Sequence, residues 1–386
     1  MTMRSLLVLD QWASPDATVG TSKNWLYEGL GRRFKMRLLN ADGANVQTSR
    51  RLSSLSRALL TNPLHWREAY HHELEWESKR PASFQKRTTR FQRALNRLNG
   101  PVDAVLQIGC LFGPVCRTDA LHASYHDQTV AMVERGWRAW LPPEFHHMRD
   151  RWMELERNAL ESRDLILTYS EAAKRSMIHD YGIDECKVHV APTACKIVYP
   201  EEAAARSPRP GRIVFASTDF LRKGGDIVLK GFQIMRRSKP ELELVLVGGA
   251  VNVSLPEGAR NLGMVPHESL VKLFLNSSLI LHPARHDAFP NVLKEAIACG
   301  LPAVASDSAG IPEIIHHGRT GIVLNQPTPE SLADASLELL TDTDRLDGMR
   351  EACIKDRELF HPDSCVERIC SILDRSLDVR SKDISI

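Results

Sequence analysis

Residues 286–307 read HDAFPNVLKEAIACGLPAVASD. Pro290 suits the first turn of a helix, where its missing N–H costs nothing, and Gly300 suits the helix end. We therefore expect a loop, then a helix over residues 290–298, then a strand over 302–306. Another apolar run, LILHP at 279–283, comes just before the loop. This order of strand, loop, helix and strand is typical of an α/β protein with a parallel sheet.

Two carboxylates flank the start of this predicted helix. Asp287 lies in the loop, Glu295 lies on the second helical turn, and seven residues separate them. Phe289, the predicted cap, has no side-chain oxygen for the first backbone amides, so these amides and the positive helix end suit an anion. The carboxyl end of a parallel strand is also where open α/β sheets bind ligands. These residues alone suit either a sugar phosphate held between two acids or an ordinary strand–loop–helix with two solvated acids.

The alternation of strands and helices restarts once along the chain, and 386 residues are too many for one ordinary core. EEAAARSPRPG, at 201–211, has the composition of a linker. We therefore predict an α/β protein with an N-terminal domain over 1–200, a C-terminal domain over 212–362, and a last helical segment over 363–386 that packs back on the first domain. Strands are expected at 6–9, 36–40, 104–109, 165–170, 187–191, 212–217, 242–249, near 262, 279–283 and 302–306.

The composition excludes several classes of protein. The apolar fraction is 43%, the charged fraction is 25% and the net charge is +2, so nothing in the totals favours a nucleic-acid partner. The eight cysteines form no CxxC pair and no cluster with histidine, which argues against a disulfide framework or a zinc site. The start, MTMRSLLVLD, suits a first strand better than a signal peptide, and no run reaches the ~18 apolar residues of a membrane span. We expect a cytoplasmic protein.

A basic stretch stands out in the first half. Residues 79–97 hold seven Lys or Arg and no acid, with Phe84, Phe91, Leu95 and Leu98 near helical spacing. One interpretation is an amphipathic helix over 79–98 that makes peripheral contact with the inner face of an anionic membrane. The other is a helix that covers a sheet and turns its basic side to solvent.

The opening stretch resembles the signature of the family-4 retaining glycosyltransferases. The match consists of FPN at 289–291, Glu295, ACGLP at 298–302, GIPEII at 310–315 and GRTGIVL at 318–324. Asp287 replaces the usual first Glu of that signature, and Ala288 replaces a Gly. The resemblance implies the GT-B fold, which has two Rossmann-like doubly wound domains facing across a cleft.

The resemblance continues over most of residues 165–325. In FASTDFLRKGGDIVLKGF, at 215–232, Lys223 corresponds to the lysine that binds the donor diphosphate. The family's usual Gly-Arg is Ser217-Thr218 here, so we expect Arg222 to supply the second cation from a different position. NLGMVPHESLVKLF, at 261–274, resembles the nucleoside-binding region, where backbone near Val265 would meet the base.

The resemblance implies that the N-terminal domain binds the acceptor and that the C-terminal domain binds the nucleotide sugar. The N-terminal half matches the family only loosely and offers two candidates. Gly20 lies where members often carry two glycines near the donor phosphate, and a plain turn glycine is the alternative. His126, in YHDQT, resembles a cleft histidine that touches the donor sugar. A structural histidine is the alternative for His126, and His122 competes for the same role.

The resemblance also implies a mechanism. Lys223, Arg222 and the amides of Phe289, Asn291 and Val292 would stabilise the charge on the leaving diphosphate, and the acceptor's proton would pass to the departing phosphate oxygen. Asp287 would bind hydroxyls of the donor sugar, and Glu295 would bind the ribose. The donor would be a nucleotide-diphosphate sugar, the acceptor a saccharide or a lipid-linked saccharide, and no metal is expected.

Two other classes remain open at this stage. One is another two-Rossmann sugar enzyme, a phosphorylase or an epimerase. The other is a catalytically degenerate homologue that binds a nucleotide or a partner.

Overall fold

The computed structural model describes residues 3–11, 23–41, 44–109, 111–117, 119–195, 210–249, 251 and 253–383. It divides into two compact units. The first comprises residues 1–192 and 366–386, and the second comprises residues 193–365. Gly20 and most of the predicted linker, residues 201–209, lie outside the described residues.

The first unit contains a six-stranded parallel sheet. The strand order is β2-β1-β3-β4-β5-β6. The bounds are β1 Ser5–Leu9, β2 Lys35–Leu39, β3 Ala104–Ile108, β4 Leu121–His126, β5 Leu165–Thr168 and β6 Val188–Val190. β4 is missing from the predicted strands because its sequence, LHASYH, alternates polar and apolar residues although every one of them is buried.

Helices cover the first sheet. They are α1 Asn24–Arg33, α2 Ala44–Thr61, α3 Trp66–Glu77, α4 Pro81–Asn96, α5 Val130–Gly136, the short η1 Arg138–Trp140, α6 Phe145–Glu161, α7 Glu171–Tyr181, the short η2 Glu185–Lys187 and the last helix, α13 Pro362–Asp383. The part of α13 beyond Cys365 belongs to this unit, where Ile369 and Leu373 lie in the same core as β1 and α1. α1 and α13 approach so closely that a Cβ on Gly29 would lie 2.2 Å from a methyl of Val366.

α4 contains most of the basic stretch. Phe84, Phe91 and Leu95 are fully buried, and Phe91 stacks on Phe112 with 4.1 Å between ring centroids. Because its apolar side lies in the core, α4 cannot lay that side on a membrane. The basic residues on its other side, among them Lys86 and Arg93, face outward. The structure therefore matches the interpretation of a sheet-covering helix.

The second unit contains another six-stranded parallel sheet, in the order β12-β11-β10-β7-β8-β9. The strands are β7 Arg212–Ser217, β8 Glu243–Gly248, β9 Ala259–Asn261, β10 Leu279–His282, β11 Ala303–Ser306 and β12 Gly321–Leu324. The helices are α8 Gly225–Ser238, α9 His267–Leu275, α10 Asn291–Ala298, η4 Ile311–Glu313, α11 Pro329–Thr341, α12 Thr343–Asp356 and η5 Arg357–Phe360. The sequence did not predict β12 or α12.

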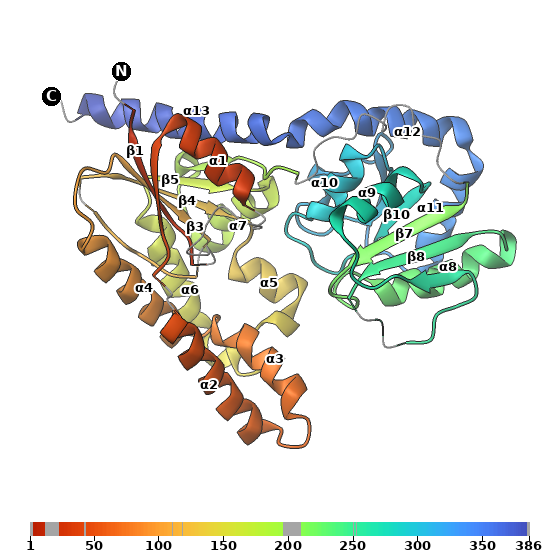
Figure 1. Ribbon diagram of the computed structural model, residues 1–386, viewed down its shortest axis with the longest axis horizontal. Coiled ribbons are helices and arrows are strands. Elements are labelled where there is room, and N and C mark those ends of the chain that lie inside the picture. Colours follow the sequence, from red (N-terminus) through yellow and green to blue (C-terminus); the bar gives the residue numbers. More distant parts are fainter. Residues whose placement is uncertain are drawn as a thin grey trace. The chain divides into compact units, whose positions relative to one another are not determined.

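Both sheets reverse their strand order at one point (Figure 1). In the first unit the reversal lies between β1 and β3, and in the second it lies between β7 and β10. The crevice outside the carboxyl ends of the strands at such a reversal is the usual ligand site of open α/β sheets. Two doubly wound parallel sheets confirm the predicted fold class. Across the described ranges, every helix is too short or too polar to span a bilayer.

Candidate functional site

The loops that follow β7 and β10 meet at the strand reversal of the second unit. The amide of Arg285 donates to the carbonyl of Arg222 over 2.8 Å. The guanidinium of Arg222 donates in return to the carbonyl of His286 over 3.0 Å. Gly224 lies so near the second loop that a Cβ would come within 2.1 Å of the Pro283 carbonyl oxygen. Its φ of +77° also favours glycine.

An ion pair joins the two loops. The Lys223 ammonium contacts Oδ2 of Asp287, and both side chains are nearly buried. His282, the last residue of β10, lies with its Nε2 3.1 Å from the same carboxylate oxygen. Burial, reinforced by Lys223 and Arg222, lowers the pKa of His282 well below its ordinary value, so the neutral ring donates from Nε2. The structure thus brings together two of the predicted site residues, Lys223 and Asp287, and adds His282, which the sequence did not indicate.

Basic side chains are concentrated and desolvated here. Burial is the main cause that lowers the pKa of Lys223 to about 6, and the charge of Arg222 acts in the same direction. Arg222 is itself buried and donates from Nε to Asp219 over 2.7 Å. Burial likewise lowers the pKa of His286 to about 4, so this ring is neutral at physiological pH. An arriving anion would favour the protonated form of Lys223.

The start of α10 differs from the prediction by one residue. Pro290, and not Phe289, is the N-cap, and no side chain caps the first turn. Phe289 is buried and packs edge-on against Phe360, with 6.2 Å between ring centroids. Its side chain thus belongs to the core. Asn291 is exposed and Val292 half-buried, so the first turn of α10 is open to a ligand.

Glu295 and Lys294 are neighbours on α10 and have different surroundings. Glu295 is nearly buried on the second turn, as the sequence predicts. Lys294 is fully buried and donates to the carbonyls of Thr193 and Ala194, over 3.0 and 3.1 Å, which ties α10 to the start of this unit. The sequence does not indicate a role for Lys294, because nothing in the spacing distinguishes a buried lysine from a solvated one.

Val265 lies in the connection between β9 and α9. This connection is held to the end of β8 by a hydrogen bond from the Gly248 amide to the Gly263 carbonyl, 2.9 Å long. Val265 is half-buried, and the neighbouring Met264 is exposed. The predicted base-binding backbone therefore lies beside a strand end on the same edge of the sheet.

The histidine candidates lie in the first unit. His126 ends β4 and is buried, and neither ring nitrogen has a hydrogen-bond partner among the described residues. Burial lowers its pKa to about 3, so it is neutral. His122 instead accepts the Arg117 amide on Nε2 over 2.9 Å, which is a structural contact. Nδ1 of His122 also lacks a partner among the described residues, so the two rings differ in that both nitrogens of His126 are unpartnered.

The second unit's site offers cations and hydroxyl-binding acids. In the described part of the chain, no group of three or more His, Cys, Asp or Glu is arranged to hold a metal ion. Lys223, Arg222 and the open turn of α10 suit a phosphorylated ligand. Asp287 and Glu295 can accept hydrogen bonds from hydroxyls.

Comparison with known families agrees with this chemistry. The model of the family Glycosyl transferases group 1 matches residues 201–356. The family model covers less than half of the chain, and its match supports a glycosyltransferase of group 1. The matched region includes both loops of the site and α10. The match does not test the assignment to family 4 in particular.

Named relatives point the same way. This glycosyltransferase is 26% identical to the D-inositol 3-phosphate glycosyltransferase of Paenarthrobacter aurescens over 63% of the chain and 69% of the relative. It is 31% identical to the GDP-mannose-dependent alpha-(1-6)-phosphatidylinositol monomannoside mannosyltransferase of Mycobacterium tuberculosis, over 36% of the chain and 41% of the relative. The second alignment thus spans less than half of that relative.

Among solved structures, the sucrose-phosphate synthase of Thermosynechococcus elongatus superimposes with a TM-score of 0.70. The superposition covers 97% of the glycosyltransferase and all of the synthase, at 15% sequence identity. Likeness at this identity concerns the fold alone, and it supports a GT-B fold with two Rossmann-like domains.

Proposed function

We propose that the protein is a retaining glycosyltransferase. It would move a sugar from a nucleotide-diphosphate sugar to an acceptor hydroxyl in the synthesis of a glycolipid or polysaccharide. One observation carries this proposal: Arg222 and Lys223 lie beside Asp287 where the strand order of the second sheet reverses. Nucleotide-sugar chemistry needs cations for the diphosphate and acceptors for sugar hydroxyls at one place.

The leaving diphosphate carries the charge that develops in the reaction. The bond between the anomeric carbon and the phosphate oxygen breaks, the acceptor oxygen bonds to that carbon, and the acceptor's proton passes to the departing oxygen. Lys223, Arg222 and the open first turn of α10 would stabilise the diphosphate. Because they act on the leaving group, no proton-abstracting side chain is required.

The acids would orient the donor. Asp287 would accept hydrogen bonds from sugar hydroxyls once the diphosphate draws Lys223 away from it. Glu295 would bind the ribose, and backbone near Val265 would meet the base. His126 would contact the donor sugar with its two unpartnered nitrogens. The cations already present beside the diphosphate would do the work of a metal, so we propose transfer without one.

The acceptor is proposed to be a saccharide or a lipid-linked saccharide. The exposed basic side of α4 would allow peripheral contact with an anionic membrane, through charge and not through insertion. We propose a cytoplasmic location on these grounds.

Thermal unfolding in the presence of UDP, GDP, ADP, CMP or dTDP tests the donor class. A ligand at 100 times its dissociation constant should add about 2.7 kcal/mol to the free energy of unfolding. We expect one diphosphate to raise the melting temperature selectively. If none does, the proposed donor site is contradicted. Lys230→Ala, at an exposed position on α8, is a control that should respond like the wild type.

A further inference from the structure

His282 is a buried polar residue at the end of a central strand of the second sheet. β10 lies between β7 and β11, and His282 is its last residue. The side chain of His282 is only 1% exposed. Burying a polar side chain is costly unless it has a partner, so the partner indicates what the residue does. Here the partner is the carboxylate of Asp287, whose Oδ2 lies 3.1 Å from Nε2 of His282.

Asp287 uses its two carboxylate oxygens differently. Oδ2 is in contact with both Nε2 of His282 and the ammonium of Lys223. Oδ1 receives no hydrogen bond from the residues that the structure describes. Each oxygen of an ionised carboxylate has two lone pairs, so Oδ1 can accept hydrogen bonds from the hydroxyls of a ligand.

The two partners of Oδ2 differ in mobility and in charge. Lys223 carries its ammonium on a flexible stem, and a diphosphate would draw it away from Asp287. The ring of His282 is fixed by its burial at the end of a strand. Burial lowers the pKa of His282 well below its ordinary value, and the charges of Lys223 and Arg222 act in the same direction. The neutral ring therefore holds Asp287 with a hydrogen bond and leaves the carboxylate its charge.

Hydrogen bonds also hold the segment of chain that joins His282 to Asp287. The amide of Ala284 donates to the carbonyl of His282 over 2.8 Å. The hydroxyl of Ser306, at the end of β11, donates to the carbonyl of Ala284 over 2.7 Å. The sheet, and not the ligand, therefore sets the distance between the histidine ring and the carboxylate.

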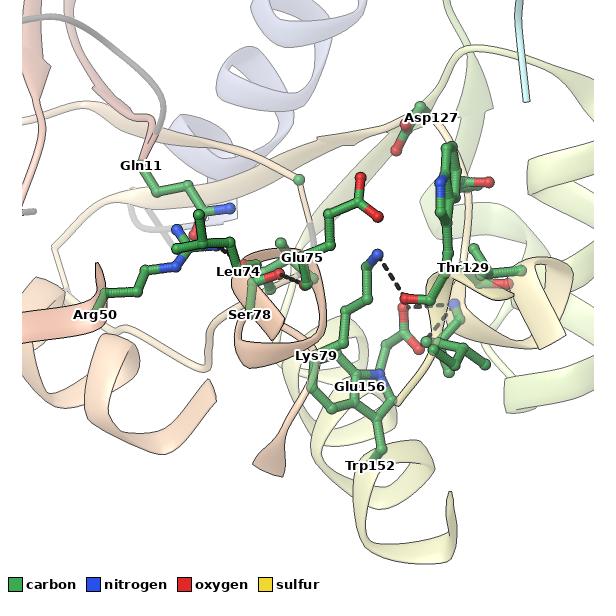
Figure 2. Close-up of a pocket in the computed structure, with 17 residues that line it drawn as sticks. Gln11, Arg50, Leu74, Glu75, Ser78, Lys79, Asp127, Thr129, Trp152 and Glu156 are labelled. Atoms are coloured by element: carbon green, nitrogen blue, oxygen red, sulfur yellow. Dashed lines mark hydrogen bonds between the residues drawn. The ribbon is translucent and has the colours of Figure 1, made fainter. Parts of the chain in front are cut away.

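Another acid that follows a parallel strand is held differently. Asp127 follows β4, and Figure 2 shows it in the wall of a cavity of about 510 Å³ in the first unit. Its hydrogen-bond donors are backbone amides, its own and that of Gln128. An acid at the end of a strand thus does not need a histidine to hold it, and the contact between His282 and Asp287 is a specific feature of the site in the second unit.

We propose that His282 is a positioning residue that orients Asp287 toward the donor sugar. This inference rests on the proposed transferase function and adds a residue to its donor site. His282 keeps Oδ2 in place when Lys223 turns to the diphosphate, so Oδ1 stays directed at the sugar hydroxyls. Asp287 is one methylene shorter than the Glu of the family signature, and the shorter side chain keeps the carboxylate within reach of the strand end.

Calorimetric titration of sugar nucleotides and of their free diphosphates tests the proposal. The probes are UDP-glucose, UDP-N-acetylglucosamine, GDP-mannose, UDP and GDP. His282→Phe removes the N–H and keeps a planar ring. It should weaken binding of the preferred sugar nucleotide at least about tenfold, as expected for the loss of one hydrogen bond to a charged group. Affinity for the matching free diphosphate should not change, because His282 acts on the sugar contact alone.

Two further variants separate positioning from loss of stability. His282→Gln places an amide N–H near the position of the ring Nε2 and should restore most of the lost affinity. Leu281→Ala removes a fully buried core side chain from the same strand, so it should lower stability and leave the ratio of the two affinities unchanged. If His282→Phe weakened both ligands equally, or neither of them, the proposal would be overturned.

A double-mutant cycle tests whether His282 acts through Asp287. In an Asp287→Asn background, His282→Phe should cause no further loss of affinity for the sugar nucleotide. The same additional loss as in the wild-type background would show that His282 acts on the ligand by another route and would contradict the positioning role.

Nitrogen NMR of the histidine rings separates this inference from the proposed function, because it needs no ligand. We expect a neutral ring with its proton on Nε2, and its signal should disappear in His282→Phe. A proton on Nδ1 would contradict the contact with Asp287. Wild-type protein that binds none of the five probes would contradict the proposed function and the role in sugar binding with it. Wild-type binding that His282→Phe leaves unchanged would contradict this inference alone.

Discussion

The strand reversals of the two sheets occupy equivalent places in the fold and carry opposite chemistry. Between β7 and β10, the loops bring together Lys223, Arg222 and Asp287, and backbone hydrogen bonds tie one loop to the other. Between β1 and β3, a largely apolar cavity holds the carboxylate of Asp127 and the unpartnered indole of Trp152. The fold therefore provides a crevice at each reversal, and the loops determine the chemistry of that crevice.

The largest effect should come from the cation at the second reversal. Lys223→Ala removes the charge closest to the leaving diphosphate, and we expect kcat for transfer to fall about 10²–10³-fold, as when one preorganised donor is lost. Initial rates with saturating donor measure this. Lys230→Ala serves as the matched control. A kcat within threefold of the wild type would show that Lys223 does not stabilise the leaving group.

A core substitution in the first unit should lower the free energy of unfolding without changing nucleotide binding in the second unit. Leu373→Ala deletes a fully buried side chain of α13 from the core of the first unit, and it should cost about 2–5 kcal/mol of unfolding free energy. Nucleotide affinity should not change, since the donor residues lie in the second unit. Denaturant titration and calorimetry measure the two quantities. Val379→Ala, at an exposed position of the same helix, should cost little. If it cost as much as Leu373→Ala, the packing of α13 would need revision.

Loss of the proposed contact between Glu295 and the ribose should have a smaller effect. Glu295→Gln weakens hydrogen bonds from ribose hydroxyls to a charged acceptor, worth about 1.5–3 kcal/mol together. We therefore expect nucleotide affinity to fall about ten- to a hundredfold. The wild type should also prefer the ribonucleotide over its deoxy form, and the variant should lose that preference. A preference that survives in Glu295→Gln would place the ribose elsewhere.

Protonation of Lys223 should be coupled to donor binding at the site in the second unit. The pKa of Lys223 is about 6 without ligand, and the diphosphate should raise it, because the anion favours the charged amine. Affinity for the nucleotide sugar should therefore be full below pH 6 and fall by up to about tenfold per unit as the pH rises toward the raised pKa. Calorimetry in buffers of different ionisation enthalpy should show proton uptake. Lys223→Ala should abolish it, and uptake that persists would point to another group.

Chelation should have the smallest effect. The cations next to the proposed diphosphate site belong to the chain, so EDTA should leave the transfer rate within about twofold of its original value. A loss of activity that added Mg²⁺ restores would show that a metal completes the donor site.

The sequence predicted the second unit better than the first. Strands such as RIVFAS and LILH are apolar throughout, and Pro290 and Gly300 mark the ends of α10, so their positions follow from local chemistry. That Lys223 and Asp287 belong to one site was inferred only from the family resemblance, because 64 positions separate them, and their direct contact was not predicted. The comparisons confirm the transferase group, but the roles of the individual site residues remain predictions.

Other features depend on tertiary packing that a sequence pattern does not reveal. β4 escaped prediction because polar side chains occupy a buried strand, and His126 at its end was identified by resemblance alone. The amphipathic pattern of α4 fits a core helix and a membrane-surface helix equally, and only the burial of Phe84 and Phe91 decides. The cavity in the first unit is lined by residues from seven separate segments, so no local sequence motif predicts it.

The most direct test of the donor site compares a nucleoside diphosphate with its monophosphate in the wild type and in Lys223→Ala. If Lys223 holds the second phosphate, the wild type should bind the diphosphate at least about tenfold more tightly, as one charge-assisted hydrogen bond provides. Lys223→Ala should lose that preference and keep its affinity for the monophosphate. A preference that Lys223→Ala retains in full would contradict the assignment of the paired loops as the diphosphate site.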